Sequence, residues 1–169
     1  DKFSAEDTAA LKAIQSYPKI LSSSIERYRF REASQELMNL ARLGNKYLAD
    51  AEPWKVVKTD PERVQTIMYV ALQISAALAV VSEPLLPGSS QKLKTMLNLD
   101  ALSWADVESG GSLLKSFHQI GEAHLLFAKI EDSEVQFQLE KLAKSKLANE
   151  IANKEIESEK ETVSFEDFS

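Results

Sequence analysis

Hydrophobic residues along the first part of the chain recur at the three- and four-residue spacing of amphipathic helices. Between residues 5 and 28 the pattern is interrupted by Pro18, which indicates either one kinked helix or two short ones. Residues 31–50 follow it more regularly and predict a single amphipathic helix. Its apolar stripe consists of Ala33, Leu37, Leu40, Ala41, Gly44, Tyr47 and Leu48.

The segment AEPWKVVKTDPE, which comes next, breaks the helical pattern. Pro53 disfavours a helical conformation for Glu52. Asp60 followed by Pro61 is typical of a helix N-cap with proline at the first helical position. A loop that contains Trp54 is therefore predicted to join two helices.

Residues 62–82 form the most apolar part of the chain, and between residues 67 and 81 only Tyr69, Gln73 and Ser75 break the apolar run. A helix that is apolar on all sides is buried, so this segment is predicted to be the central helix of a bundle. A membrane span needs about 20 apolar residues. This run is shorter and has charged residues on its N-terminal side, so we expect no membrane association.

Two prolines in SEPLLPGSS end the central helix, and Ser89 or Ser90 is expected to cap a short helix after it. Residues 98–126 show little periodicity, with at most a short helical piece around Trp104, whose side chain is expected to fill core. Residues 133–160 predict a last helix, with apolar residues that pack near its start and an almost wholly charged end.

Together these elements predict an all-α fold, a helical bundle with a charged C-terminal helix or linker. Residues 1–100 are expected to form the bundle, residues 101–131 an irregular segment packing on it, and residues 132–169 the C-terminal helix and an acidic linker. The composition agrees, because 5 Gly and 5 Pro leave little material for the turns of an all-β fold. A chain of 169 residues is also too short for a multi-domain enzyme.

Charge is distributed unevenly along the chain. Residues 131–169 contain five lysines and eleven acidic residues, which accounts for the whole net charge of -6. Residues 19–63 contain nine basic and seven acidic residues, and Arg27, Arg29 and Arg31 lie close together there. This mild basic patch is compatible with RNA binding without being diagnostic of it.

Catalytic and metal-binding motifs are not apparent. The sequence has no Cys, which removes thiol nucleophiles and thiolate ligands and suits a reducing cytoplasm, and its first residues lack the apolar stretch of a signal peptide. His118 and His124 lie six residues apart without metal-site spacing, and no Gly-rich phosphate loop or H-E-x-x-H motif occurs. On its residues alone, the chain is a helical binding module with no expected catalytic or metal site.

Three motifs carry a resemblance to a known family. They are F-R-E-A at residues 30–33, the G-N-K-Y to E-P-W-K run at residues 44–55, and P-L-L-P at residues 84–87. In this order and spacing they resemble the anticodon-binding region of bacterial-type methionyl-tRNA synthetases. Related class I synthetases for Leu, Ile, Val and Cys share the bundle, but Asn-x-Tyr leading into Pro-Trp is most similar to the methionine enzyme.

The C-terminal part agrees with this resemblance. Residues 121–142 are similar to the segment that leaves the bundle in this family, and residues 162–169 resemble the opening of its C-terminal tRNA-binding barrel. The family's anticodon-reading helix with an Asn and an Arg precedes the region that begins here. The resemblance therefore implies a fragment of a cytoplasmic ligase that attaches methionine to tRNA(Met).

Cofactors and assembly follow from the same resemblance. ATP with Mg²⁺, and a candidate Zn²⁺, are expected in the absent catalytic domain and none in this fragment. The parent enzyme is expected to form a homodimer through the missing C-terminal domain. The alternative function is a helical protein-interaction module with an acidic tail.

The resemblance also implies roles for individual residues. Trp54 is expected to stack on a base of the anticodon loop, Pro53 to shape the turn that presents it, and Asn45 to give supporting contacts. Arg27 and Arg31 are four residues apart, and we expect them to share one helical face and contact phosphates if that face is also the side of Trp54.

Each of these residues also has an ordinary structural interpretation. A Trp after a Pro at a helix junction is commonly a core side chain. The arginines can pair with Glu26 and Glu32 on a solvated face, and Asn45 can simply brace the loop. The exposure of Trp54 separates the first pair of alternatives.

Overall fold

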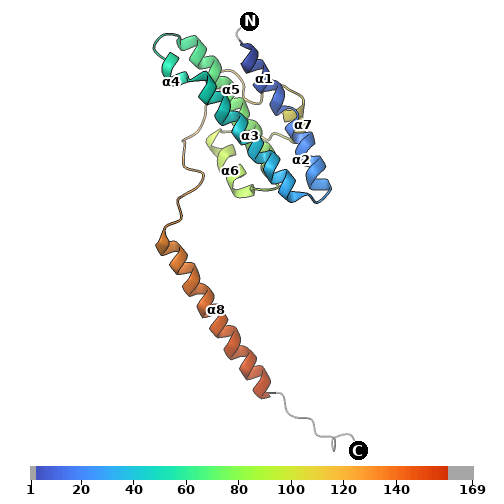
Figure 1. The fold of residues 1–169 in the computed structure, drawn as a ribbon, viewed down its shortest axis with the longest axis vertical. Coiled ribbons are helices and arrows are strands. Elements are labelled where there is room, and N and C mark those ends of the chain that lie inside the picture. The colour runs from blue at the N-terminus through green and yellow to red at the C-terminus, as the bar shows by residue number, and fades with distance from the viewer. Residues whose placement is uncertain (1–2, 160–169) are drawn as a thin grey trace, which may run out of the picture. The chain divides into compact units, whose positions relative to one another are not determined.

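The computed structural model describes residues 3–159 and contains, within that range, eight helices and no strand (Figure 1). The chain divides into two compact units between Leu126 and Phe127. The predicted all-α fold is confirmed. The expected barrel segment at residues 162–169 lies outside the described residues.

Two short helices open the first unit, α1 (Ala5–Ile14) and α2 (Tyr17–Glu26). The hydroxyl of Ser4 accepts a hydrogen bond from the Asp7 amide at 3.2 Å, and the Asp7 carboxylate accepts one from the Ser4 amide at 2.9 Å. This reciprocal capping box fixes the start of α1. Pro18 lies in the first turn of α2, where a missing N–H breaks no helical hydrogen bond.

The long helix α3 (Phe30–Ala51) is followed directly by the one-turn helix α4 (Pro53–Val56). Glu52, between them, has a left-handed backbone with φ 43° and ψ 54°, which ends α3. The predicted loop therefore contains a helical turn, since proline is well suited to the first position of a helix. The buried side chains of α3 are Ala33, Leu37, Leu40 and Tyr47.

The apolar helix α5 (Pro61–Val81) is the centre of the bundle, as predicted. The side chain of Asp60 caps it by accepting a hydrogen bond from the Arg63 amide at 2.9 Å. Helices α1, α3, α4, α6 and α7 all pack against α5. By length and composition α5 could cross a membrane, but half of its most apolar stretch is buried inside the bundle, as expected for a core helix.

The following helix, α6 (Pro87–Met96), begins earlier than predicted. Pro87 occupies its first turn, so Ser89 and Ser90 lie inside the helix and neither caps it. The buried Ser90 hydroxyl instead donates a hydrogen bond to the carbonyl of Ala79 on α5, at 2.6 Å. The expected serine cap was wrong, because the proline starts the helix before either serine is reached.

An irregular segment with one short helix, α7 (Trp104–Glu108), completes the first unit. Trp104 is half-buried against the core, as expected. The buried amide of Gln73 on α5 donates to the Leu114 carbonyl at 2.8 Å and accepts from the Leu113 amide at 2.8 Å. A single polar side chain thus holds the backbone of this segment against the central helix.

The second unit contains the 28-residue helix α8 (Asp132–Glu159). Its apolar side chains are exposed, and they do not form one continuous stripe along the helix. The described part of the second unit contains no other helix, so the expected packing at the start of α8 stays a prediction. The exposed positions are Val135, Phe137, Leu139, Leu142, Leu147 and Ile151.

Helices α3 and α5 approach closely at Gly44, where an added Cβ would lie 3.1 Å from Cγ2 of the buried Ile74. We predict that Gly44→Leu lowers the free energy of unfolding by about 1–3 kcal/mol through overpacking. Urea denaturation measures the change. The matched control is Gly88→Leu in the first turn of α6, where an added Cβ meets no atom of another element within 4 Å and no loss of stability is expected. Equal stability of both variants would contradict the close packing.

Candidate nucleic-acid interface

Trp54 projects from the segment between α3 and α5, residues 52–60, which contains α4 and which we call the connector. Its relative exposure is 61%, and Lys55, Val57 and Lys58 on the same connector are also exposed. A tryptophan that filled the core would be almost fully buried. The structure therefore excludes the core interpretation of Trp54 and leaves its ring available to a partner.

Backbone hydrogen bonds hold this connector at both ends. The Glu52 amide donates to the Leu48 carbonyl at 3.0 Å, which closes the last turn of α3. The Asp60 amide donates to the Val56 carbonyl at 2.8 Å, which closes the turn after α4. Lys55 also forms an ion pair with Glu52 at 2.8 Å. Pro53 starts α4, so Trp54 is presented from a helical turn with fixed ends.

Asn45 is exposed on α3 and precedes Glu52 by seven residues, which is about two helical turns. Asn45 therefore lies in the last two turns of α3, before the connector that carries Trp54. Tyr47 points from another face into the core. The structure thus places Asn45 near the end of α3 that is followed by Pro53 and Trp54.

Arg27 and Arg31 do not share a helical face, contrary to the prediction. Arg27 follows α2 as its C-cap residue, whereas Arg31 lies in the first turn of α3. The chain reverses between them at Tyr28, whose φ of 59° is left-handed. Sequence spacing was misleading here because no proline or glycine marks this turn.

These arginines also lie far from Trp54. They are at the start of α3 and Trp54 follows its end, and the 22 residues of α3 span about 33 Å (Figure 1). The structure therefore brings Trp54, Pro53 and Asn45 to one end of the bundle and places both arginines at the other.

The turn between α2 and α3 exposes aromatic as well as basic side chains. Tyr28 and Phe30 are 82% and 53% exposed, and their rings meet edge to face with centroids 6.4 Å apart. Glu32 pairs with Arg29 at 3.5 Å and accepts a hydrogen bond from the Ser24 hydroxyl at 2.8 Å. The alternation of aromatic and basic residues at 27–31 was a signal for this surface that the sequence analysis did not use.

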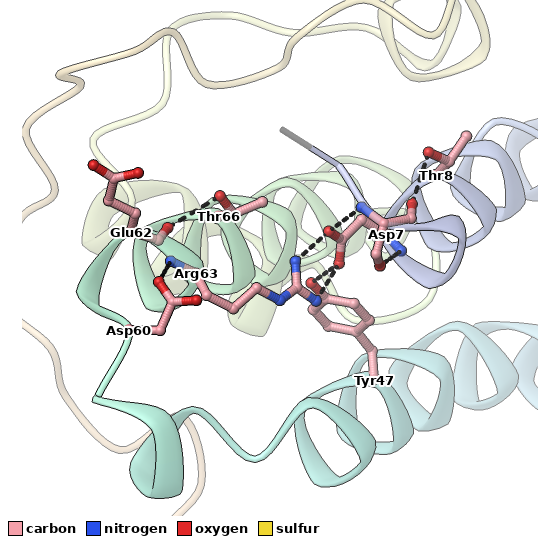
Figure 2. A network of polar contacts seen from close by, with 8 residues as sticks. Asp7, Thr8, Tyr47, Asp60, Glu62, Arg63 and Thr66 are labelled. Carbon is pink, nitrogen blue, oxygen red and sulfur yellow. Dashed lines mark hydrogen bonds and ion pairs between the residues drawn. The ribbon is translucent and has the colours of Figure 1, made fainter. Parts of the chain in front are cut away.

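A polar network joins α1, α3 and α5 (Figure 2). The carboxylate of Asp7, on α1, is fully buried and accepts a hydrogen bond from the Tyr47 hydroxyl at 2.6 Å. The guanidinium of Arg63 also binds it through both terminal nitrogens, with Nη2 3.0 Å from Oδ1 and Nη1 on Oδ2. We call Asp7, Tyr47 and Arg63 the Asp7 clamp. Separations of 40 and 56 residues kept it from being recognised in the sequence.

The clamp shifts the ionisation of its members. Burial acts to raise the pKa of Asp7, but hydrogen bonds from Arg63, Tyr47 and the Ser4 amide outweigh it and hold that pKa far below its ordinary value. Burial, together with the hydrogen bond to Asp7, raises the pKa of Tyr47. The hydrogen bond to Asp7 also raises the pKa of Arg63. Asp7 and Arg63 therefore form an ion pair across the neutral pH range.

The histidines and acidic residues do not form a metal site in the part of the chain that the structure describes. Nε2 of His118 lies 2.7 Å from the Leu97 carbonyl, a contact that ties the irregular segment to the end of α6. Exposed His124 lies 3.9 Å from Glu122. Each histidine thus contacts a group of the protein itself.

The first unit is thus a helical bundle that exposes a tryptophan and basic side chains on its surface, an arrangement typical of a binding module. The chain matches the model of the family described as the anticodon binding domain of methionyl tRNA ligase over residues 1–146. It belongs to this family, as predicted, and the protein-interaction alternative is not favoured.

Known relatives give the same assignment. The chain is 57% identical over 169 residues to a methionine-tRNA ligase of Flavobacterium psychrophilum, with 99% of the chain covered. It is 55% identical to the methionine-tRNA ligase of Christiangramia forsetii and 52% identical to that of Cytophaga hutchinsonii, with 98% and 99% covered. The chain spans about a quarter of the length of these curated relatives. It corresponds to their anticodon-binding region.

The Asp7 clamp predicts a specific response to acid. Because the pKa of Asp7 is depressed in the folded state, its stabilisation is present above the ordinary value of 3.8 and is lost as the pH falls below it. We predict that Asp7→Asn lowers the free energy of unfolding by roughly 3 kcal/mol at pH 7. The same change should flatten the decline of Tm below about pH 4. Thermal melts from pH 7 to pH 2 measure both effects, and parallel curves for wild type and variant would argue against this role.

Proposed function

We propose that this chain supplies the anticodon-recognition surface of a methionine-tRNA ligase and that tRNA(Met) is its RNA partner. The observation that supports the proposal is the exposed ring of Trp54 on a fixed turn, in a chain of this family. Unpaired loop bases offer flat π-faces, and proteins commonly hold such bases by stacking them on aromatic side chains. Trp54 is therefore the proposed stacking platform.

The neighbouring residues have supporting roles in this proposal. Pro53 starts the turn that presents Trp54, and its fixed φ limits the conformations available to that turn. Asn45 is exposed near the end of α3 that precedes this turn and offers amide hydrogen bonds to the loop backbone or to a base. Recognition thus combines stacking with a polar contact from an adjacent helix.

Arg27 and Arg31 have a different place in the proposal. The length of α3, about 33 Å, separates them from the end of the bundle that carries Trp54, so in this proposal the phosphates that they contact are remote from the stacked base. Their guanidinium groups are exposed at the turn between α2 and α3, where neighbouring Arg29 pairs with Glu32. This contact adds affinity without reading the anticodon.

The chemistry of the parent enzyme lies outside this chain. We propose a cytoplasmic ligase that attaches methionine with ATP and Mg²⁺ in a catalytic domain, which also holds any Zn²⁺, and that forms a homodimer through a further C-terminal domain. Residues 1–100 act as the recognition bundle with residues 101–126 packed on it. Residues 132–169 lead toward the tRNA-binding domain. Since α5 is a core helix, no membrane contact is proposed.

We predict that Trp54→Ala in the intact ligase weakens binding of tRNA(Met) by about 1–3 kcal/mol, the usual loss per stacked base, and leaves Tm nearly unchanged. Filter binding, methionine charging and a thermal melt measure these effects. The matched control is Val57→Ala, which removes exposed apolar surface from the same connector without removing a ring. A tRNA with a swapped anticodon tests specificity. A large fall in Tm with intact anticodon discrimination would defeat the stacking role.

We predict that this chain alone binds tRNA weakly and in a salt-sensitive manner, because its small basic patch neutralises few phosphates and counterion release scales with their number. Replacing both Arg27 and Arg31 by Ala should lower the magnitude of the slope of log K against log salt by about 1 to 2. Arg29→Ala is the matched control, because Arg29 already pairs with Glu32. Titrations at several salt concentrations measure the slope, and an unchanged slope would remove the arginines from the interface.

A further inference from the structure

The Asp7 clamp connects the two helices that lie before and after the connector with Trp54. Tyr47 lies just over one turn before the end of α3, and Arg63 lies in the first turn of α5. Both side chains bind the carboxylate of Asp7, which belongs to α1 (Figure 2). The helix before Trp54 and the helix after it are thereby tied to one common point.

Arg63 links this point directly to the connector. Its backbone amide donates to the side chain of Asp60, the last residue of the connector, at 2.9 Å. Its guanidinium at the same time makes a forked contact with Asp7. A forked contact fixes direction as well as distance, because two parallel hydrogen bonds restrict the plane of the guanidinium. The start of α5 therefore cannot rotate without breaking one of these contacts.

Stability alone does not account for a buried ionic network at this place. Removing a carboxylate and a guanidinium from water is costly, and well-packed apolar side chains of similar volume often stabilise a protein as much or more. The Asp7 carboxylate accepts four hydrogen bonds, from the Ser4 amide, the Tyr47 hydroxyl and two nitrogens of Arg63. These fill the acceptor sites of a carboxylate and make the arrangement directional.

We infer that Asp7, Tyr47 and Arg63 are positioning residues that hold Trp54 in the orientation needed to stack on an anticodon base. The inference rests on the proposed function and adds a group of residues that act through Trp54 without touching RNA. Preorganisation raises affinity because a turn that is already ordered loses little conformational entropy on binding. A loosened clamp should therefore weaken binding even while the bundle remains folded.

The first experiment is a double-mutant cycle between Tyr47 and Trp54 in the 169-residue chain. Tyr47→Phe removes only the hydroxyl that binds Asp7 and keeps the packed ring. We expect it to weaken binding of tRNA(Met) three- to tenfold at a temperature well below the melting of every variant. In a Trp54→Ala background the same change should have no further effect, because the residue through which it acts is gone.

Tyr69→Phe is the matched control for the loss of a tertiary hydrogen bond. The Tyr69 hydroxyl lies 2.8 Å from the Ser112 hydroxyl, at a place on α5 that does not belong to the clamp. This variant should bind tRNA(Met) as the wild type does. Arg63→Lys, which keeps the charge but loses the forked contact, should bind more tightly than Arg63→Gln.

The second experiment observes Trp54 directly. The chain contains two tryptophans, so Trp104→Phe makes Trp54 the only one. In this background Tyr47→Phe should lower the fluorescence anisotropy of Trp54 in the absence of RNA, and Tyr69→Phe should leave it unchanged. Circular dichroism of each variant verifies that the bundle is folded.

The outcomes separate the inference from the proposal on which it rests. If Tyr47→Phe lowers Tm but neither binding nor anisotropy changes, the clamp is only structural and the inference is overturned. Equal weakening in the presence and absence of Trp54 also overturns it. If Trp54→Ala binds tRNA(Met) as the wild type does, the stacking proposal fails instead. In that case the fluorescence anisotropy of Trp54 in the Tyr47→Phe variant still tests whether the clamp orders this side chain, and an unchanged anisotropy overturns the inference.

Discussion

The burial of α5 is the constraint on which the first unit depends. Nine residues of this helix are buried, and each large apolar side chain removed from water contributes about 1.5–3 kcal/mol. One helix so apolar has to be covered on nearly all sides, and the other helices of the unit pack around it for that reason. Even Gln73, its buried polar residue, fastens a further segment to its surface.

Hydrophobic burial holds helices together without fixing their rotation, because it is proportional to area and has no direction. Directional information in this bundle comes from a few buried polar groups. Asp7 relates α1 to α3 and α5, while Ser90 relates α6 to α5 through the Ala79 carbonyl. The Asp7 clamp lies near the end of α3 and the start of α5, the two helices that the connector with Trp54 joins.

The elements of this fold were largely predictable from local patterns. Apolar periodicity identified α3 and α5, and Asp60 with Pro61 marked the start of α5, because such signals depend only on neighbouring residues. The same reasoning failed where local signals compete, as at Pro87 and Ser90. It also failed where tertiary contacts decide, since neither the Asp7 clamp nor the reversal at Tyr28 has a marker nearby in the sequence.

The exposure of Trp54 could not follow from its neighbours either, because Pro followed by Trp at a helix junction suits a core side chain equally well. The left-handed backbone of Glu52 has a consequence for this side chain. A non-glycine residue in this region stores about 1–2 kcal/mol of conformational energy, and the residue before a proline has few alternatives. Folding of the bundle supplies that energy in advance. In the proposed function, RNA would therefore meet a connector that is already ordered, with little search among loop conformations.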